Sequence, residues 1–170
     1  MAHRKRDLVV GILFLAVALT PVAAVAGPFE DGLKAAESGD FATAVRLWQP
    51  LAEQGHAEAQ NNLGVMYGYG YGVPQDEAEA AKWFRLAAEQ GHAYSQGRLG
   101  GMLLDGRGVP RDYVQAHMWF SLAVSRLPPG GKRDMTINNR NAAAEHMTPA
   151  QIAKAEKLAR EWWKRRKQYE

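Results

Sequence analysis

Glycines are the first residues of this sequence whose spacing suggests chemistry. The stretch LGVMYGYGYGVPQD, residues 63–76, holds four of them, and a glycine-rich loop can bind a phosphate through its backbone N–H groups. The usual companions are missing, because no strand pattern precedes the stretch and no Gly-Lys-Ser/Thr is present. The same design returns 36 residues later as LGGMLLDGRGVPRD, residues 99–112. A phosphate loop has no reason to recur at a fixed interval, so we assign these glycines to the architecture of a repeat.

Histidine is the next residue type that could do chemistry, as a metal ligand. His56 and His92 end two copies of the sequence AEQGH, 36 residues apart. Equivalent positions on neighbouring helical hairpins lie about 10 Å apart, whereas a metal ion needs its ligands at about 2 Å. We therefore expect both rings to cap helices, and we expect no metal site and no cofactor.

Hydrolytic chemistry has no better support in the sequence. The chain has no cysteine, and none of its serines stands in Gly-x-Ser-x-Gly or Ser-x-x-Lys. Acidic residues such as Asp76, Glu77 and Glu79 begin a helix, where the helix dipole accounts for them. We expect a protein that is not an enzyme, and a catalytic pair assembled across helices is the alternative that the sequence leaves open.

The elements that must position all these residues are helices, since no stretch alternates apolar and polar residues for long enough to form a strand. The fold class that we predict is all-α, an α/α solenoid of helical hairpins, four in number. The predicted helices cover residues 29–38, 40–54, 57–69, 76–90, 93–104, 112–126, 133–146 and 149–167.

The residues that recur at the 36-residue interval are those that should build this fold. A carboxylate at the start of the second helix caps it, two glycines in the preceding turn supply positive φ, and a glycine inside the first helix admits a close neighbour. Tryptophans and leucines at the same interval should form the core between repeats. The structural repeat positions are Leu63, Gly64, Tyr67, Gly70, Gly72, Asp76 and Trp83, then Leu99, Gly100, Gly106, Gly108, Asp112 and Trp119.

With these positions the unit resembles the Sel1-like repeat, a relative of the tetratricopeptide repeat with a longer, glycine-rich turn. Residues 57–92 have the family's Leu-Gly, Tyr, Gly-x-Gly-Val, Asp, Ala, Trp and Ala-Ala-x-x-Gly in order. Residues 93–130 are a second copy, in which Leu103 replaces the tyrosine and no glycine follows at the spacing of Gly91. The resemblance implies a scaffold or adaptor for protein–protein contact, in some bacterial relatives acting in envelope signalling, and it implies no reaction.

The beginning of the chain has the pattern of a secretory signal peptide. Arg4-Lys5-Arg6 precede an apolar run that ends at Leu19, and Ala24-Val25-Ala26 supply small residues for cleavage after Ala26. We expect a periplasmic or secreted protein. A retained membrane anchor is the alternative, although the run is shorter than the roughly 20 residues that span a bilayer.

The whole chain then divides into five segments. The segments are a signal peptide at 1–26, a divergent N-terminal hairpin or cap at 27–56, Sel1-like repeats at 57–92 and 93–130, and C-terminal capping helices with a basic tail at 131–170.

A partner should bind to what the stack leaves outside, and in tetratricopeptide-like solenoids the first helices line the concave face. The non-core positions of these helices differ between the two copies, which fits recognition and equally fits drift on a solvated face. The partner-binding residues that we predict are Glu58, Asn61, Asn62, Val65, Tyr94, Gly97 and Arg98. The runner-up function is a cell-wall or small-molecule-active periplasmic protein that uses the same groove as its site.

Charge argues against a nucleic-acid partner. Residues 27–150 hold 11 Lys/Arg against 14 Asp/Glu, whereas residues 151–170 hold 7 against 3. The basic character of the chain therefore belongs to its ends and not to the body. Lys164, Arg165, Arg166 and Lys167 should complement the end of the last helix, and a weak peripheral contact with an anionic membrane is the alternative.

Overall fold

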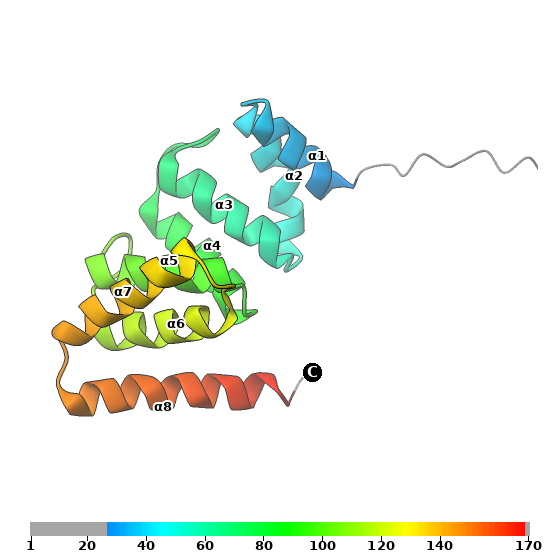
Figure 1. Cartoon of the computed structure of the whole chain (residues 1–170). Helices are drawn as coiled ribbons and strands as arrows, with labels where there is room; N and C mark the ends of the chain where they lie inside the picture. Colours follow the sequence, from blue (N-terminus) through cyan, green and yellow to red (C-terminus); the bar gives the residue numbers. More distant parts are fainter. Residues whose placement is uncertain (1–26, 169–170) are drawn as a thin grey trace, which may run out of the picture.

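The protein is described by a computed structural model over residues 27–168, and this part of the chain is helix and turn with no strand (Figure 1). The predicted signal peptide, residues 1–26, lies outside the described residues. Each predicted helix is present, with ends within 2 residues of the prediction. The helices are α1 (Pro28–Glu37), α2 (Phe41–Glu53), α3 (Ala57–Tyr69), α4 (Glu77–Glu89), α5 (Ala93–Asp105), α6 (Tyr113–Arg126), α7 (Gly131–Glu145) and α8 (Pro149–Arg166).

The helices form three hairpins, α1–α2, α3–α4 and α5–α6, which are stacked through contacts of α2 with α3 and of α4 with α5. The predicted α/α solenoid is thus confirmed. Aromatic residues at the repeat interval fill the spaces between hairpins, because Trp48, Trp83, Phe84, Trp119 and Phe120 are all buried. The hairpins therefore stabilise one another by burying large apolar side chains, each of which contributes about 1.5–3 kcal/mol.

The end of the stack differs from the prediction of a fourth hairpin. Helices α7 and α8 each pack on α6, on either side of it in Figure 1, and not substantially on each other. The reason lies in α8, whose apolar face joins the core of the last repeat through Ala155 and Trp162. In α7 only Thr136 and Ala143 are buried.

Side-chain caps begin the second helices of all three hairpins, which confirms the prediction for Asp76 and Asp112. The carboxylate of Asp40 accepts a hydrogen bond from the backbone N–H of Thr43 at 3.1 Å, and that of Asp112 accepts one from Gln115 at 2.9 Å. The carboxylate of Asp76 accepts from two backbone N–H groups, both at 2.9 Å.

Histidines cap the first helices, which confirms the prediction for both rings. The Nδ1 atom of His56 accepts from the N–H of Ala59 at 3.2 Å, and that of His92 accepts from the N–H of Ser95 at 3.3 Å. An accepting Nδ1 must be unprotonated, so these caps belong to the neutral ring. At the start of α8, Thr148 and Gln151 form a capping box.

Glycines set the spacing within and between the hairpins. A Cβ on Gly64 would lie 2.6 Å from the ring of Phe84, and one on Gly100 would lie 2.8 Å from the ring of Phe120. In the turns, Gly108 has φ +65°, and a Cβ there would collide with the backbone carbonyl of Glu77 at the start of the preceding second helix. The turn glycines thus provide more than positive φ, since they allow one repeat to contact the next.

Candidate functional site

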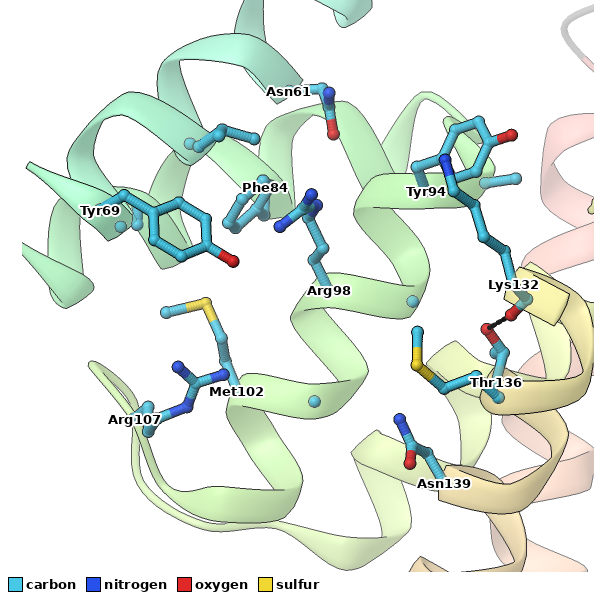
Figure 2. Close-up of a pocket in the computed structure, with 18 of the residues that line it drawn as sticks. Asn61, Tyr69, Phe84, Tyr94, Arg98, Met102, Arg107, Lys132, Thr136 and Asn139 are labelled. Atoms are coloured by element: carbon cyan, nitrogen blue, oxygen red, sulfur yellow. Dashed lines mark hydrogen bonds between the residues drawn. The ribbon is translucent and has the colours of Figure 1, made fainter. Parts of the chain in front are cut away.

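A groove of about 540 Å³ opens between α3, α5 and α7. Figure 2 shows its walls, with α5 in the middle and α7 opposite α3. The floor is open because α5 carries Gly97 and Gly101 on this face, and a Cβ on Gly101 would meet no atom within 4 Å. The first helices of the stack, with α7 continuing the series, therefore form a hollow that the fold itself does not fill.

Large apolar side chains remain exposed along this groove. Tyr69 is 60% exposed, Met135 is 59% exposed and Tyr94 is 42% exposed. These are three of the six large hydrophobic side chains that are exposed in residues 27–168. Exposed apolar side chains gathered in one hollow make it a candidate site for binding another molecule.

Cations occupy the same hollow. The guanidinium of Arg98 lies 5.5 Å from the centre of the Phe84 ring, and the ammonium of Lys132 lies 4.7 Å from the centre of the Tyr94 ring. In the part of the chain that the structure describes, neither cation has a carboxylate within 4 Å. The groove is therefore electropositive at its centre and along the α7 wall.

A third cation, Arg107, lies at the end of the groove and is neutralised. Its guanidinium lies 3.6 Å from the carboxylate of Glu77 and 3.4 Å from that of Asp105. Glu77 is also the one carboxylate among the groove-lining residues.

Buried polar side chains hold the helices behind the groove in register. The amide of Gln60 donates to the carbonyl of Ala52 at 2.9 Å, and that of Gln96 donates to the carbonyl of Ala88 at 3.1 Å. Each bond joins the first helix of one hairpin to the end of the preceding helix. This pair was not predicted from the sequence, although the two glutamines are 36 residues apart.

One further bond crosses directly between two walls of the groove. The hydroxyl of Ser95 on α5 donates to the side-chain oxygen of Asn61 on α3 at 3.0 Å. The walls formed by α3 and α5 are therefore held before any partner arrives.

The structure brings five of the seven predicted partner-binding residues to the groove and leaves two outside it. Glu58 lies at the start of α3 near His56, whose Nδ1 is 3.5 Å from its carboxylate. Asn62 accepts a hydrogen bond from the Asn61 side chain at 3.2 Å. The five that line the groove are Asn61, Val65, Tyr94, Gly97 and Arg98.

The groove residues that were not predicted from the sequence include all those on α7. The prediction assigned α7 to a terminal hairpin, whereas the 36-residue interval, continued from α5, would have placed another first helix near residues 129–141. The missed residues include Tyr69, Met102, Lys132, Met135, Thr136 and Asn139.

A second hollow, of about 690 Å³, lies over α4, α6 and α8. It covers the joint between the last helix and the repeats, where Arg166 donates a hydrogen bond to the carbonyl of Gln90. Arg126 helps to close the same joint, since its guanidinium lies 4.4 Å from the Trp163 ring and donates to the carbonyl of Gly91 at 3.0 Å. This hollow therefore belongs to the attachment of α8.

Two histidines outside the groove have a lowered pKa. Burial lowers the pKa of His117. The charge of Arg140 lowers this pKa further by a smaller amount, and the charge of Glu156 raises it slightly. Burial also lowers the pKa of His92, against a smaller raising effect of Glu58. Within residues 27–168, no three histidine or carboxylate side chains gather as a metal site, and no helix is long and apolar enough to cross a membrane.

Comparisons with known proteins agree with this architecture. The family model described as the Sel1 repeat matches residues 29–56, 57–92 and 93–126. A solved structure of a protective antigen from uropathogenic Escherichia coli strains, which displays an SLR fold, is similar with a TM-score of 0.71 and 33% identity, over 79% of this chain and 29% of that chain. The present chain thus spans less than a third of that antigen.

A Sel1 repeat protein from Oxalobacter formigenes is also similar, with a TM-score of 0.58 and 29% identity, over 66% of this chain and 86% of that chain. No curated protein matches.

Proposed function

The chain belongs to the Sel1 repeat family, and from that premise we propose that it is an exported adaptor that binds a segment of another protein in the groove between α3, α5 and α7. Sel1 repeats are scaffolds that generally mediate protein–protein interaction. The groove between α3, α5 and α7 is the feature of this chain that supports such a role.

The observation that supports binding most directly is the composition of the groove. Exposed Tyr69, Tyr94 and Met135 offer apolar contact, and Arg98 and Lys132 offer charge. Its lining has no histidine and no serine, and its one carboxylate, Glu77, is paired with Arg107. Such a surface can hold a partner, and its lining shows no serine–histidine pair of the kind that hydrolases use.

The exported location and the envelope context rest on the sequence. The basic start, the apolar run and the small residues before Gly27 support export and cleavage after Ala26, and the family resemblance supports a part in envelope signalling or assembly. The mature protein recovered from a periplasmic extract should begin at Gly27, which intact-mass measurement checks. An uncleaved chain in the membrane fraction would refute this location.

The basic end of α8 supports a weak additional contact with anionic lipid. Lys164, Arg165 and Lys167 add positive charge near the chain end, and attraction to a charged surface falls as salt rises. Removing residues 164–170 should abolish binding to liposomes that contain anionic lipid. Unchanged binding would refute a membrane contact by this segment.

The groove can be blocked without disturbing the fold, because Gly101 has open space at its Cβ position. We compare Gly101→Trp with Leu86→Trp, a control on α4 at an exposed position outside the groove. A protein partner from an envelope extract should be retained by the wild type and by Leu86→Trp but lost by Gly101→Trp, with helical circular dichroism unchanged in both variants.

Other outcomes of the same comparison decide against the proposal. A sugar or metabolite retained in the same groove-dependent way would favour the runner-up function. Equal retention of every captured protein by all three forms would refute the groove as the binding site.

A further inference from the structure

Resting on the proposed function, we infer that the groove binds an extended protein segment whose acidic side chains pair with Arg98 and Lys132. The groove combines two unneutralised cations with exposed apolar side chains, and this combination selects a particular kind of partner. The alternatives are a neutral apolar segment, a nucleic acid and a second copy of this chain.

The charges in the groove run against those of the body. Residues 27–150 carry 14 acidic against 11 basic residues, yet the groove centre presents Arg98 and the α7 wall presents Lys132 with no carboxylate of the described chain within 4 Å. Arg107, by contrast, is paired with Glu77 and Asp105. A local reversal of sign favours an anionic partner and speeds its association.

Arg98 and Lys132 are also held where a partner would meet them. Each cation lies near an aromatic ring, that of Phe84 or that of Tyr94, which orients the side chain without cancelling its charge. In Figure 2 the Arg98 side chain stands in the middle of the groove between Tyr69 and the α7 wall. The repeat does not require this cation, because the equivalent residue one repeat earlier is Asn62.

The form of the partner follows from the remaining groups. The floor at Gly97 and Gly101 allows a main chain to approach closely. The side-chain amide of Asn139 has no hydrogen-bond partner within residues 27–168, so it can donate to and accept from a peptide backbone. An extended segment has free N–H and C=O groups along its whole length for such bonds, whereas a helix uses all but those at its ends internally. Met135 and Tyr69 then provide contacts for its apolar side chains.

A nucleic acid fits this surface less well than an acidic peptide does. Nucleic-acid binding typically neutralises about 6–10 phosphates with basic side chains. The groove supplies two unpaired cations on an acidic body. Two carboxylates flanked by apolar side chains match that number.

The test selects peptides without assuming their sequence. Displayed random peptides of about 12 residues, long enough to cross the groove in extended form, are selected on the mature wild-type protein and then depleted on the folded Gly101→Trp variant. We expect the groove-dependent peptides to be enriched in Asp and Glu together with aliphatic or aromatic residues. Groove-dependent peptides that are neutral or basic would overturn the inference while leaving the proposed function intact, whereas no groove-dependent peptide at all would overturn both.

A charge-matched pair of variants then tests the two named cations. The best acidic peptide, labelled with a fluorophore, is titrated with the wild type, with Arg98→Glu/Lys132→Glu, and with Arg46→Glu/Lys154→Glu, whose exposed side chains lie outside the groove. Both double variants change the net charge equally. We expect the groove variant to raise the Kd by about tenfold or more and the control to change it less than about threefold.

Salt and self-association complete the test. The wild-type Kd should rise when NaCl increases from about 50 to about 300 mM. Equal weakening by the two double variants would show a diffuse charge effect and overturn the role of Arg98 and Lys132. Sedimentation that shows a dimer broken by Gly101→Trp would overturn the inference in favour of a second copy of the chain.

Discussion

Gly100 and Gly101 are neighbours in the middle of α5, and replacing each with alanine should change stability in opposite directions. Both lie in helical conformation, so alanine in either place removes the helix penalty of glycine, about 1 kcal/mol. Their surroundings differ. A Cβ on Gly101 meets nothing within 4 Å, whereas a Cβ on Gly100 lies 2.8 Å from two carbons of the Phe120 ring.

The size of the opposing term follows from that contact. Carbon atoms rest about 3.5–4.0 Å apart, so the Phe120 ring must retreat by roughly 0.7 Å or more. The ring is 0% exposed and lies in the core that joins α5, α6 and α8. Overpacking of this kind costs about 1–3 kcal/mol. We expect Gly101→Ala to raise the free energy of unfolding by about 1 kcal/mol, and Gly100→Ala to lower it by up to about 2 kcal/mol after the helix gain is counted.

Urea unfolding and thermal unfolding, both followed by far-ultraviolet circular dichroism, measure both variants. A change of about 1 kcal/mol should move the Tm by about 3 °C for a chain of this size, so the two Tm values should differ by roughly 3–9 °C. Gly64→Ala repeats the test in α3, where a Cβ would lie 2.6 Å from the Phe84 ring, and should also destabilise. A Gly100→Ala variant as stable as Gly101→Ala would refute the close approach of helix and ring as the reason for these glycines.

Three further predictions concern a turn, a cap and an exposed contact. Gly108→Ala should lower the free energy of unfolding by about 3 kcal/mol or more, because strain at φ +65° adds to a collision of the new Cβ with the backbone of Glu77. Gly39 has φ +84° and no atom within 4 Å of a Cβ position, so Gly39→Ala should lower the free energy of unfolding by only about 1 kcal/mol in the same urea assay. Burial lowers the pKa of His92 below 6.5, so as pH falls the unfolded chain takes up this proton before the folded chain does. The free energy of unfolding should therefore fall as pH drops from about 7.5 to about 5.5. His92→Asn, which keeps a good cap, should flatten this pH dependence, and an unchanged slope would contradict the prediction. Arg107→Ala should cost less than about 1 kcal/mol because its ion pairs are exposed, whereas Tyr71→Ala, which removes two stacked ring contacts, should cost about 1–2 kcal/mol.

The fold was largely predictable because it repeats. Each feature that recurs at 36 residues, such as the aspartate caps and the turn glycines, has a local physical reason that a sequence pattern reveals. The end of the stack was less predictable because it does not repeat. Whether α7 packs on α8 or on α6 depends on which helix offers the larger apolar face. Trp162 on α8 joins the core around Trp119, and no local sequence pattern indicates this contact.

The groove was predictable to the extent that it lies on the first helices. Asn61, Tyr94 and Arg98 were found because the repeat fixes which side of α3 and α5 faces away from the core. Lys132 and Met135 were not found, since their place depends on the packing of α7. The charge pattern of the groove could not be predicted either, because it arises from which cations find carboxylates in three dimensions.

Comparison of two equivalent contacts shows how the repeat permits this charge pattern. Phe41, Tyr69 and Tyr71 form a stack of rings where the turn of one hairpin meets the start of the preceding second helix, with ring centres 4.8 and 5.5 Å apart. The residues 36 positions later in the same arrangement are Glu77, Asp105 and Arg107, which form an ionic cluster instead.

Because the turn glycines hold the backbone, the side chains at this joint can change chemistry while the hairpins keep their spacing. At the joint between the first and second hairpins, the aromatic stack leaves Tyr69 exposed in the groove. At the joint between the second and third hairpins, the carboxylates of Glu77 and Asp105 neutralise Arg107. The two carboxylates are thereby paired with Arg107 at the end of the groove, and neither Arg98 nor Lys132 has a carboxylate of the described chain within 4 Å.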